Sequence, residues 1–229
     1  MLETNVVKNR ILIVTATAVE ASALEGIALP DGLDGPDFLV TGIGPMACAY
    51  GLTRYLSRNR LPLMAINAGI SGSYRSDLPI GSTVVVRRDC FADYGVEEPG
   101  GCFIPAVKAS LASGTGGIFD EGGWIECRNE LMPILEGKTR FVTAITSDTV
   151  TGSPERVELI KSRFNPDIES MEGATFFYIC ALEKVPFLAV RAVSNRVGER
   201  DHSLWNIPLA LGNLREKIEG ILKFLPANG

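Results

Sequence analysis

Six short apolar runs, most of them rich in β-branched residues, set the strongest limit on the fold of this chain. They lie at 10–17, 38–43, 63–67, 83–87, 141–145 and 186–193. Runs of this length and character are typical of strands that are buried on both faces of a parallel sheet. Segments with helical patterns alternate with them, which predicts an α/β fold with a central, largely parallel sheet and helices on both of its faces.

The helical patterns fall in four segments. A proline suits the first turn of the helix expected over 46–58, and a capping serine, a proline and an acid open the one over 153–163. A third helix is expected over 171–184, whereas 93–136 is rich in glycine and predicts irregular structure. In the last segment, apolar residues at spacings of three and four share one helix face, namely Leu211, Leu214, Ile218, Ile221, Leu222 and Leu225.

Size and charge exclude several classes of partner. With 229 residues, the chain can bury on the order of 70% of the surface that it exposes when unfolded, enough for a single domain over 1–229. Its 27 acidic side chains outnumber the 22 basic ones, and no block of lysine or arginine offers the positive surface that nucleic acid requires. Glycine, proline and asparagine interrupt its uncharged runs, so we expect no membrane span.

The use of cysteine and histidine indicates the compartment and the chemistry. The apolar run after Lys8 and Arg10 resembles a secretion signal only superficially, because Glu20 ends it before any credible cleavage site. The five cysteines are widely spaced and form no CxxC pair, which fits reduced packing residues. His202 is the only histidine, which argues against metal catalysis and a Ser-His-Asp triad. We therefore expect a cytoplasmic protein that uses no metal or cofactor.

Four polar features follow predicted strands or open helices. They are Glu20, a small-residue turn expected at 69–73, Glu172 at a helix start, and Asn195. Ligands of open α/β sheets bind at the carboxyl ends of the strands, which makes these residues candidates for a site. Each one alone also has a structural interpretation: a solvated carboxylate, a helix-start acid or a turn former.

Taken together, the segments that carry these residues resemble the purine nucleoside phosphorylase and nucleosidase superfamily. They are residues 11–24, 40–49, 66–74, 170–178 and 191–207. Within the superfamily, the residues at 92–97 and the Ser-Asn and Trp-Asn-Ile elements after the last strand are most similar to the futalosine hydrolases, nucleosidases of menaquinone biosynthesis. The resemblance implies hydrolysis of an N-ribosidic bond without a cofactor. It also implies a three-layer α/β/α fold around a mixed, partly barrel-like sheet, with the active site near the interface of a homodimer or higher homo-oligomer.

The resemblance also implies roles for individual residues. Glu20 matches the group that accepts a proton from the attacking water, and Glu172 matches the acceptor for the ribose hydroxyls, with Met171 packed against the sugar. Asn195 stands where relatives that cleave adenine nucleosides carry aspartate. Because a 6-oxopurine presents the acceptors N7 and O6, the amide of Asn195 favours hypoxanthine as the leaving base, although a rotated amide also fits adenine.

Further substrate contacts follow from the same resemblance. Thr149 and Val150 are expected beside the base. Ile70 and Ser71 are expected in the third turn, where Ile70 replaces a serine of the adenine-specific relatives.

Futalosine carries a carboxyphenyl ketone on C5′, which requires an apolar slot with a cation at its end. Arg196 and Arg200 are the nearby cations, and a guanidinium pairs with a carboxylate through two parallel hydrogen bonds. Glu199 and Asp201 are alternative partners for both. Trp205 is expected either to form a wall of the slot or to anchor the last helix.

Three other functions remain compatible with the sequence. A purine nucleoside phosphorylase needs a phosphate site; the turn at 42–44 offers backbone N–H groups, but no arginine or lysine stands beside it or beside 69–73. A methylthioadenosine/S-adenosylhomocysteine-type nucleosidase would release adenine. A nucleoside-binding module would keep the pocket without catalysis, against which the two carboxylates argue.

Overall fold

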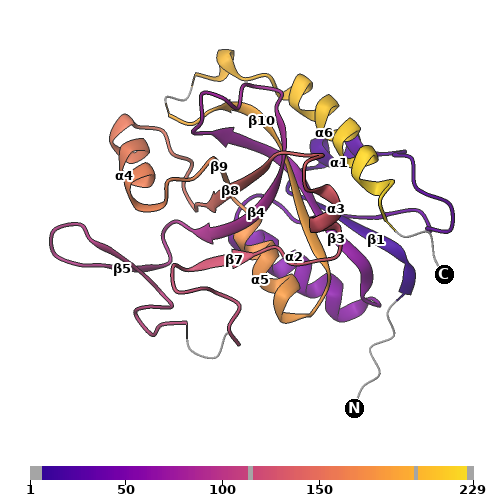
Figure 1. The fold of residues 1–229 in the computed structure, drawn as a ribbon, viewed down its shortest axis with the longest axis horizontal. Coiled ribbons are helices and arrows are strands. Elements are labelled where there is room, and N and C mark those ends of the chain that lie inside the picture. The colour runs from indigo at the N-terminus through magenta and orange to yellow at the C-terminus, as the bar shows by residue number, and fades with distance from the viewer. Residues whose placement is uncertain (1–6, 113–115, 199–200, 226–229) are drawn as a thin grey trace.

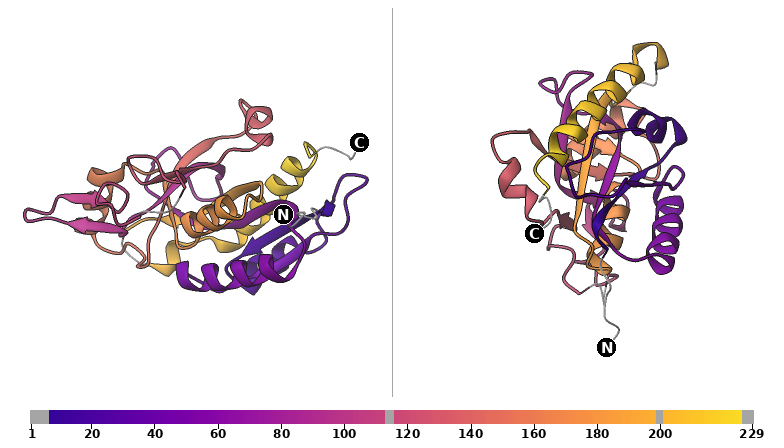
Figure 2. Two further views of the ribbon diagram at one scale, coloured as in Figure 1. Left: turned by 90° about the horizontal axis from the view of Figure 1, so that it is seen from below. Right: turned by 90° about the vertical axis from the view of Figure 1, so that its right-hand side faces the viewer.

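An eight-stranded mixed sheet lies at the centre of the computed structural model, which describes residues 7–112, 116–198 and 201–225 (Figure 1). Its strands are β1 (Val7–Thr15), β2 (Asp37–Val40), β3 (Pro62–Ser73), β4 (Thr83–Phe91), β7 (Trp124–Glu126), β8 (Phe141–Thr146), β9 (Ile168–Ser170) and β10 (Phe187–Arg196). The strands β5 (Gly95–Glu97) and β6 (Phe103–Pro105) form a separate hairpin that extends away from the rest of the molecule (Figures 1 and 2).

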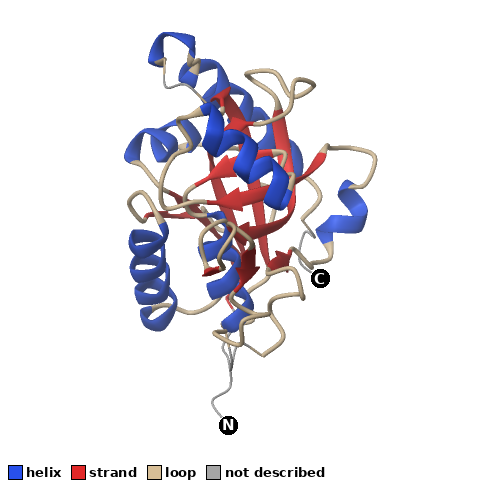
Figure 3. Cartoon of the chain, turned by 90° about the vertical axis from the view of Figure 1, so that its left-hand side faces the viewer, coloured by secondary structure: helices blue, strands red, loops and turns tan. Residues whose placement is uncertain are grey.

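Helices surround this sheet (Figure 3). They are α1 (Ala18–Leu24), α2 (Pro45–Arg58), α3 (Leu131–Leu135), α4 (Pro154–Phe164), α5 (Gly173–Leu182) and α6 (Ile207–Leu222), with a 3-10 turn at His202–Leu204. Helix α2 packs on α5, which lies against β4 and β8, while α1 packs on α6, which lies against β10 and β3. The helices therefore cover the sheet in two groups, as the α/β prediction requires.

The strand β3 has three neighbours, and this partly closes the sheet. It pairs in parallel with β1 as far as Asn67, in parallel with β10 as far as Ser73, and antiparallel with β9 at Gly72 and Ser73. Since β10 also pairs with β4, β4 with β8, and β8 with β9, these five strands form a closed ring. The expected mixed, partly barrel-like sheet is confirmed.

The main correction to the predicted elements concerns residues 69–73. They form no turn but continue β3, because β10 pairs with them up to Arg196. The strand predicted at 83–87 likewise continues to Phe91, paired with β8. Helix α1 was not predicted, and the mostly irregular stretch 93–136 contains short strands and the helix α3.

The predicted helix signals are confirmed at both α4 and α6. The hydroxyl of Ser153 accepts a hydrogen bond from the backbone N–H of Arg156 at 3.2 Å, which caps α4 at its first turn. Helix α6 turns its apolar face toward the sheet, and the buried residues are Ala210, Leu211, Leu214, Ile218, Ile221 and Leu222.

Candidate active site

Glu20 is a buried carboxylate held between α1 and β3. It is the third residue of α1, and the residue that caps this helix, Thr17, donates both its backbone N–H (2.9 Å) and its hydroxyl (2.8 Å) to Glu20 Oε2. The other oxygen, Oε1, accepts from the backbone N–H of Ile70 at 3.1 Å. Only 6% of Glu20 is exposed. A capping box thus fixes the carboxylate on one side, and the strand fixes it on the other.

The position facing this carboxylate on β3 must be a glycine. A Cβ atom on Gly69 would lie 2.8 Å from Glu20 Oε1, closer than a carbon and an oxygen can approach. The missing side chain therefore lets Oε1 lie directly against the backbone of β3.

Glu172 is the second buried carboxylate and lies at the start of α5. Its Oε1 accepts a hydrogen bond of 2.8 Å from the backbone N–H of Gly44, which has a φ of 92° that favours glycine. Burial raises the pKa of Glu172, whereas the N–H of Gly44 and the charge of Arg191 oppose the rise and the charge of Glu20 adds to it. The structure therefore places these two predicted residues close enough for the charge of Glu20 to act on the pKa of Glu172.

Arg191 supplies a buried positive charge that the sequence analysis missed. It lies on β10 with 2% of its surface exposed, and its guanidinium donates to the Asn67 carbonyl oxygen at 2.9 Å and to Asn67 Oδ1. Its charge opposes the rise in pKa that burial causes at both Glu172 and Asp89. The available signal was a single arginine inside an otherwise apolar strand.

Asp89 is a third buried carboxylate, also missed, at the end of β4. Its Oδ1 accepts from the hydroxyl of Thr146 at 3.1 Å, and its Oδ2 has no hydrogen-bond partner among the described residues. A Cβ on Gly173 would lie 2.1 Å from this Oδ2, so α5 begins directly against it. Burial raises the pKa of Asp89 to about 7, although Arg191 opposes the rise.

Asn195 lies further along the same sheet edge. It pairs with Gly72 of β3, whereas Glu20 contacts β3 at Ile70 and lies over Gly69. Three residues of a strand span about 10 Å. The amide Nδ2 of Asn195 donates to the Arg196 carbonyl at 2.8 Å, and its Oδ1 accepts from the hydroxyl of Ser194 at 2.9 Å. The amide is thus separated from the paired carboxylates along β3.

The remaining predicted contact residues lie near the carboxyl ends of the strands. Ile70 and Met171 are partly buried, and Ser71 is buried with a hydroxyl that lacks a partner among the described residues. In the loop after β8, Thr149 is exposed and Val150 is partly exposed.

Arg196 and Trp205, which the sequence analysis assigned to the C5′ substituent, both make contacts within the protein. The guanidinium of Arg196 donates to the Arg75 carbonyl and, at 3.0 Å, to the Ser76 carbonyl. The ring of Trp205 is partly buried, with its centroid 4.7 Å from that of His202. Arg200 lies outside the described residues.

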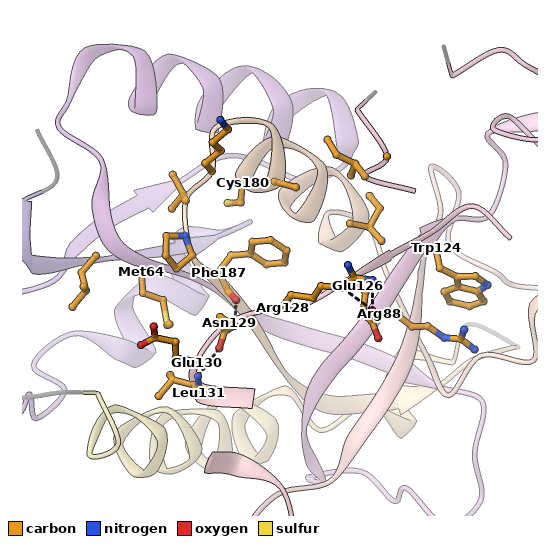
Figure 4. Close-up of a pocket in the computed structure, with 18 of the residues that line it drawn as sticks. Met64, Arg88, Trp124, Glu126, Arg128, Asn129, Glu130, Leu131, Cys180 and Phe187 are labelled. Carbon is orange, nitrogen blue, oxygen red and sulfur yellow. Dashed lines mark hydrogen bonds and ion pairs between the residues drawn. The ribbon is translucent and has the colours of Figure 1, made fainter. Parts of the chain in front are cut away.

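A cavity of about 860 Å³ lies away from these residues, where β3 and β10 begin (Figure 4). Met64 and Phe187 line it, as do Trp124 and Arg88, and none of the predicted site residues does.

In the described ranges, no three His, Cys, Asp or Glu side chains are grouped so as to hold a metal ion. No helix in the same ranges is long and apolar enough to cross a membrane. All five cysteines are free, and four of them are buried.

Comparison with known proteins identifies the family. Residues 38–223 match the model of the phosphorylase superfamily. The chain is 32% identical over 226 residues to the futalosine hydrolase of Streptomyces coelicolor, which covers 91% of this chain and 93% of the relative. It is 29% identical over 177 residues to the 5′-methylthioadenosine/S-adenosylhomocysteine nucleosidase of Geobacillus thermodenitrificans, which covers 74% of this chain and 71% of the relative.

A solved structure has the same fold. The native structure of the futalosine hydrolase of Helicobacter pylori superposes with a TM-score of 0.74 at 19% identity and covers 95% of this chain and 99% of that one. The predicted resemblance is thereby confirmed at the level of sequence and of fold. The chain belongs to the phosphorylase superfamily and, within it, to the family of the futalosine hydrolases.

Proposed function

We propose that this nucleosidase hydrolyses the N-ribosidic bond of futalosine and releases hypoxanthine and dehypoxanthine futalosine, a step of menaquinone biosynthesis. The observation that carries the proposal is the pair of buried carboxylates, Glu20 and Glu172, with the amide of Asn195 further along the same strand end. Cleavage passes through a ribosyl cation, so negative charge is needed at the sugar and hydrogen-bond donors are needed at the leaving base.

Glu20 is assigned the role of activating the attacking water. A carboxylate offers about four acceptor sites, and the two donors of Thr17 and the N–H of Ile70 occupy three of them. The remaining acceptor site is on Oε1, which lies against the backbone of Gly69. A water there gives its proton to Glu20 while its oxygen bonds to C1′, and the electron pair of the broken C1′–N9 bond leaves with the purine.

Glu172 holds the sugar and stabilises its developing positive charge. The Gly44 N–H occupies one of its acceptor sites and leaves others for the ribose hydroxyls. Arg191 opposes the rise in pKa that burial causes, which favours the ionised form that the mechanism requires. Met171, the preceding residue, is assigned to pack against the sugar.

Asn195 is assigned to the base. Its Oδ1 accepts from the Ser194 hydroxyl, so its NH2 group is the donor, and one of its two N–H bonds is used by the Arg196 carbonyl. The second can donate to N7 or O6 of hypoxanthine. An unmatched buried polar group costs about 1–3 kcal/mol, which corresponds to roughly fivefold to 150-fold discrimination. Thr149 and Val150 are also assigned to contact the base.

The C5′ substituent is assigned to the segment that follows β10. Arg196 uses two of its five N–H donors on backbone carbonyls and keeps the others for a carboxylate. Trp205 is assigned to the apolar wall of the slot, and Arg200 is assigned as a second cation for the substrate carboxylate. Ile70 and Ser71 are assigned to the part of the pocket that holds the sugar.

We also propose that the protein is a homodimer or higher homo-oligomer. Four apolar side chains on α1, on α2 and in the turn before α2 are largely exposed: Val19 (64%), Ile43 (63%), Met46 (86%) and Tyr50 (68%). Exposed apolar side chains that form one patch mark a contact surface. Light scattering should give a multiple of the 24.6 kDa chain mass, and Met46→Glu should lower the measured mass.

The free cysteines favour the cytoplasm, and the chain is assigned to one domain over 1–229.

A phosphorylase is the second candidate. In the structure, unlike in the sequence, an arginine does lie near the strand end, because Arg191 pairs with Gly69. Its guanidinium is buried and bonded to Asn67, which leaves it unavailable to a phosphate from solvent.

The test is to incubate the protein with futalosine, inosine and methylthioadenosine, without and with phosphate, and to identify the free bases. We expect hypoxanthine from futalosine at a rate that does not depend on phosphate. Release that requires phosphate and yields a ribose 1-phosphate indicates the phosphorylase. Faster release of adenine indicates the methylthioadenosine-type nucleosidase, and binding without turnover indicates a binding module.

A further inference from the structure

The carboxylate of Glu169 binds three donors from two separate segments. Its Oε1 accepts from the backbone N–H of Thr151 at 2.9 Å. Its Oε2 accepts from the hydroxyls of Thr151 and Tyr74, both at 2.6 Å. Glu169 is 6% exposed and Thr151 is 2% exposed. One buried carboxylate therefore joins the loop after β8 to the residue that follows β3.

We propose that Glu169 is a positioning residue that holds the loop 149–151 against the end of β3, so that this loop meets the purine in a fixed place. The proposal rests on the proposed function, in which Thr149 and Val150 contact the base.

The register of the sheet places this cluster opposite Asn195. Gly72 pairs with Asn195 on one side and with Glu169 on the other, so the three residues form one row across β10, β3 and β9. Directly paired residues direct their side chains to the same face of a sheet, and two strand spacings amount to about 10 Å. The central residue has no side chain, and a Cβ there would lie 3.3 Å from Asn195 Nδ2. The amide and the Glu169 cluster thus border the same strip of the sheet.

The chemistry of the three donors explains why a carboxylate stands at this position. A carboxylate only accepts, and all three of its partners can donate. A glutamine can keep the bond from the Thr151 N–H, but its NH2 group would face the two hydroxyls as a donor, so both of these bonds would have to reverse and would lose their charged acceptor. Hydrogen bonds to a charged acceptor are also about twice as strong as neutral ones. Glu169→Gln should therefore loosen the loop without changing the volume of the side chain.

A matched control lies immediately before β9. Asp167 Oδ2 accepts from the backbone N–H (2.8 Å) and the hydroxyl (3.1 Å) of Thr143, the same pair of donor types on β8. It fixes the middle of β8 rather than the loop after it. Asp167→Asn should therefore lower the melting temperature to a similar extent but leave substrate recognition unchanged.

The experiment compares Glu169→Gln, Asp167→Asn and Tyr74→Phe with the wild type on futalosine and on its 6-amino counterpart. We expect Glu169→Gln to lower kcat/KM for futalosine about tenfold to a hundredfold, the range for a small misplacement of substrate-positioning groups, and to change the ratio of kcat/KM between the two bases. Asp167→Asn should stay within about twofold of the wild type in both quantities. Tyr74→Phe, which removes one donor, should shift both in the same direction as Glu169→Gln by a smaller factor.

Unchanged kcat/KM in a folded Glu169→Gln protein would overturn the proposal, and so would equal losses in Glu169→Gln and Asp167→Asn. If Glu169→Gln does not fold, Tyr74→Phe decides in the same way. If the wild type prefers methylthioadenosine, the proposed substrate is wrong, and the positioning role is judged by the same comparison on methylthioadenosine. If no nucleoside is cleaved, the dissociation constants for inosine are compared instead.

Discussion

Replacement of Asp89 by asparagine should stabilise the protein at neutral and alkaline pH. The carboxylate is buried, and its Oδ2 has no partner among the described residues. In Asp89→Asn, the amide oxygen can keep the bond from Thr146. The new NH2 group replaces Oδ2 beside Gly173, where the hydroxyl of Ser170 also lacks a partner among the described residues. The substitution therefore removes a charge without removing a satisfied hydrogen bond.

The magnitude follows from the pKa of Asp89. Burial raises this pKa from 3.8 to about 7 in the folded state. A difference of about three pKa units corresponds to about 4 kcal/mol, which is an upper bound for the destabilisation that the ionised side chain causes. Between pH 4 and 7 the folded state binds more protons than the unfolded state, so the contribution of Asp89 to stability decreases as the pH rises. The destabilisation that the ionised carboxylate of Asp89 causes is absent below about pH 4 and reaches its full value above about pH 7.

The assay is urea unfolding of the wild type and Asp89→Asn at pH 4.5, 6 and 8. We expect Asp89→Asn to exceed the wild type in free energy of unfolding by an amount that grows with pH and reaches up to about 4 kcal/mol at pH 8. A difference that does not depend on pH, or a variant that loses stability relative to the wild type between pH 4.5 and 8, would refute the reasoning. Asp77→Asn is a suitable control, because Arg140 and Arg75 lower the pKa of this exposed carboxyl to about 2, so its difference from the wild type should stay nearly constant between pH 4.5 and 8.

Three further substitutions test the site. Glu20→Gln should leave the melting temperature nearly unchanged and lower kcat at least about a hundredfold, as loss of a general base does; a rate near that of the wild type would remove Glu20 from the mechanism. Gly69→Ala places a Cβ 2.8 Å from Glu20 Oε1 and should lower kcat/KM at least about tenfold in a protein with an unchanged circular dichroism spectrum. Glu172→Ala should lower kcat/KM on a ribonucleoside about a hundredfold or more; unchanged kcat/KM would leave Glu172 with a structural role only.

Local signals predicted the elements that local interactions form. Ser153 caps α4 by accepting a hydrogen bond from Arg156, only three residues further along the chain. The apolar spacing that predicts α6 likewise lies within one segment of the sequence. The continuation of β3 through 69–73 depends instead on pairing with β10, which is more than a hundred residues away in the sequence. The small residues at 69–73 predict a turn when only local sequence is considered, because the sequence does not show which strand pairs with them.

The same distinction applies to the site. Glu20 and Glu172 could be found because they belong to motifs that the family resemblance covers. Arg191 and Asp89 could not be assigned, because a charge inside an apolar strand acquires meaning only from groups on other elements, here Asn67 and Thr146. The capping box of Thr17 and Glu20 was visible in the sequence as a threonine followed three residues later by a glutamate, and it should have predicted α1.

The most direct test of the central claim is the ratio of kcat/KM for two nucleosides that share the C5′ substituent of futalosine and differ only in carrying hypoxanthine or adenine. The amide of Asn195 predicts that the wild type releases hypoxanthine at least about fivefold faster, since an unmatched polar contact at the base costs about 1 kcal/mol or more. Equal release of the two bases, or faster release of adenine, would contradict the claim.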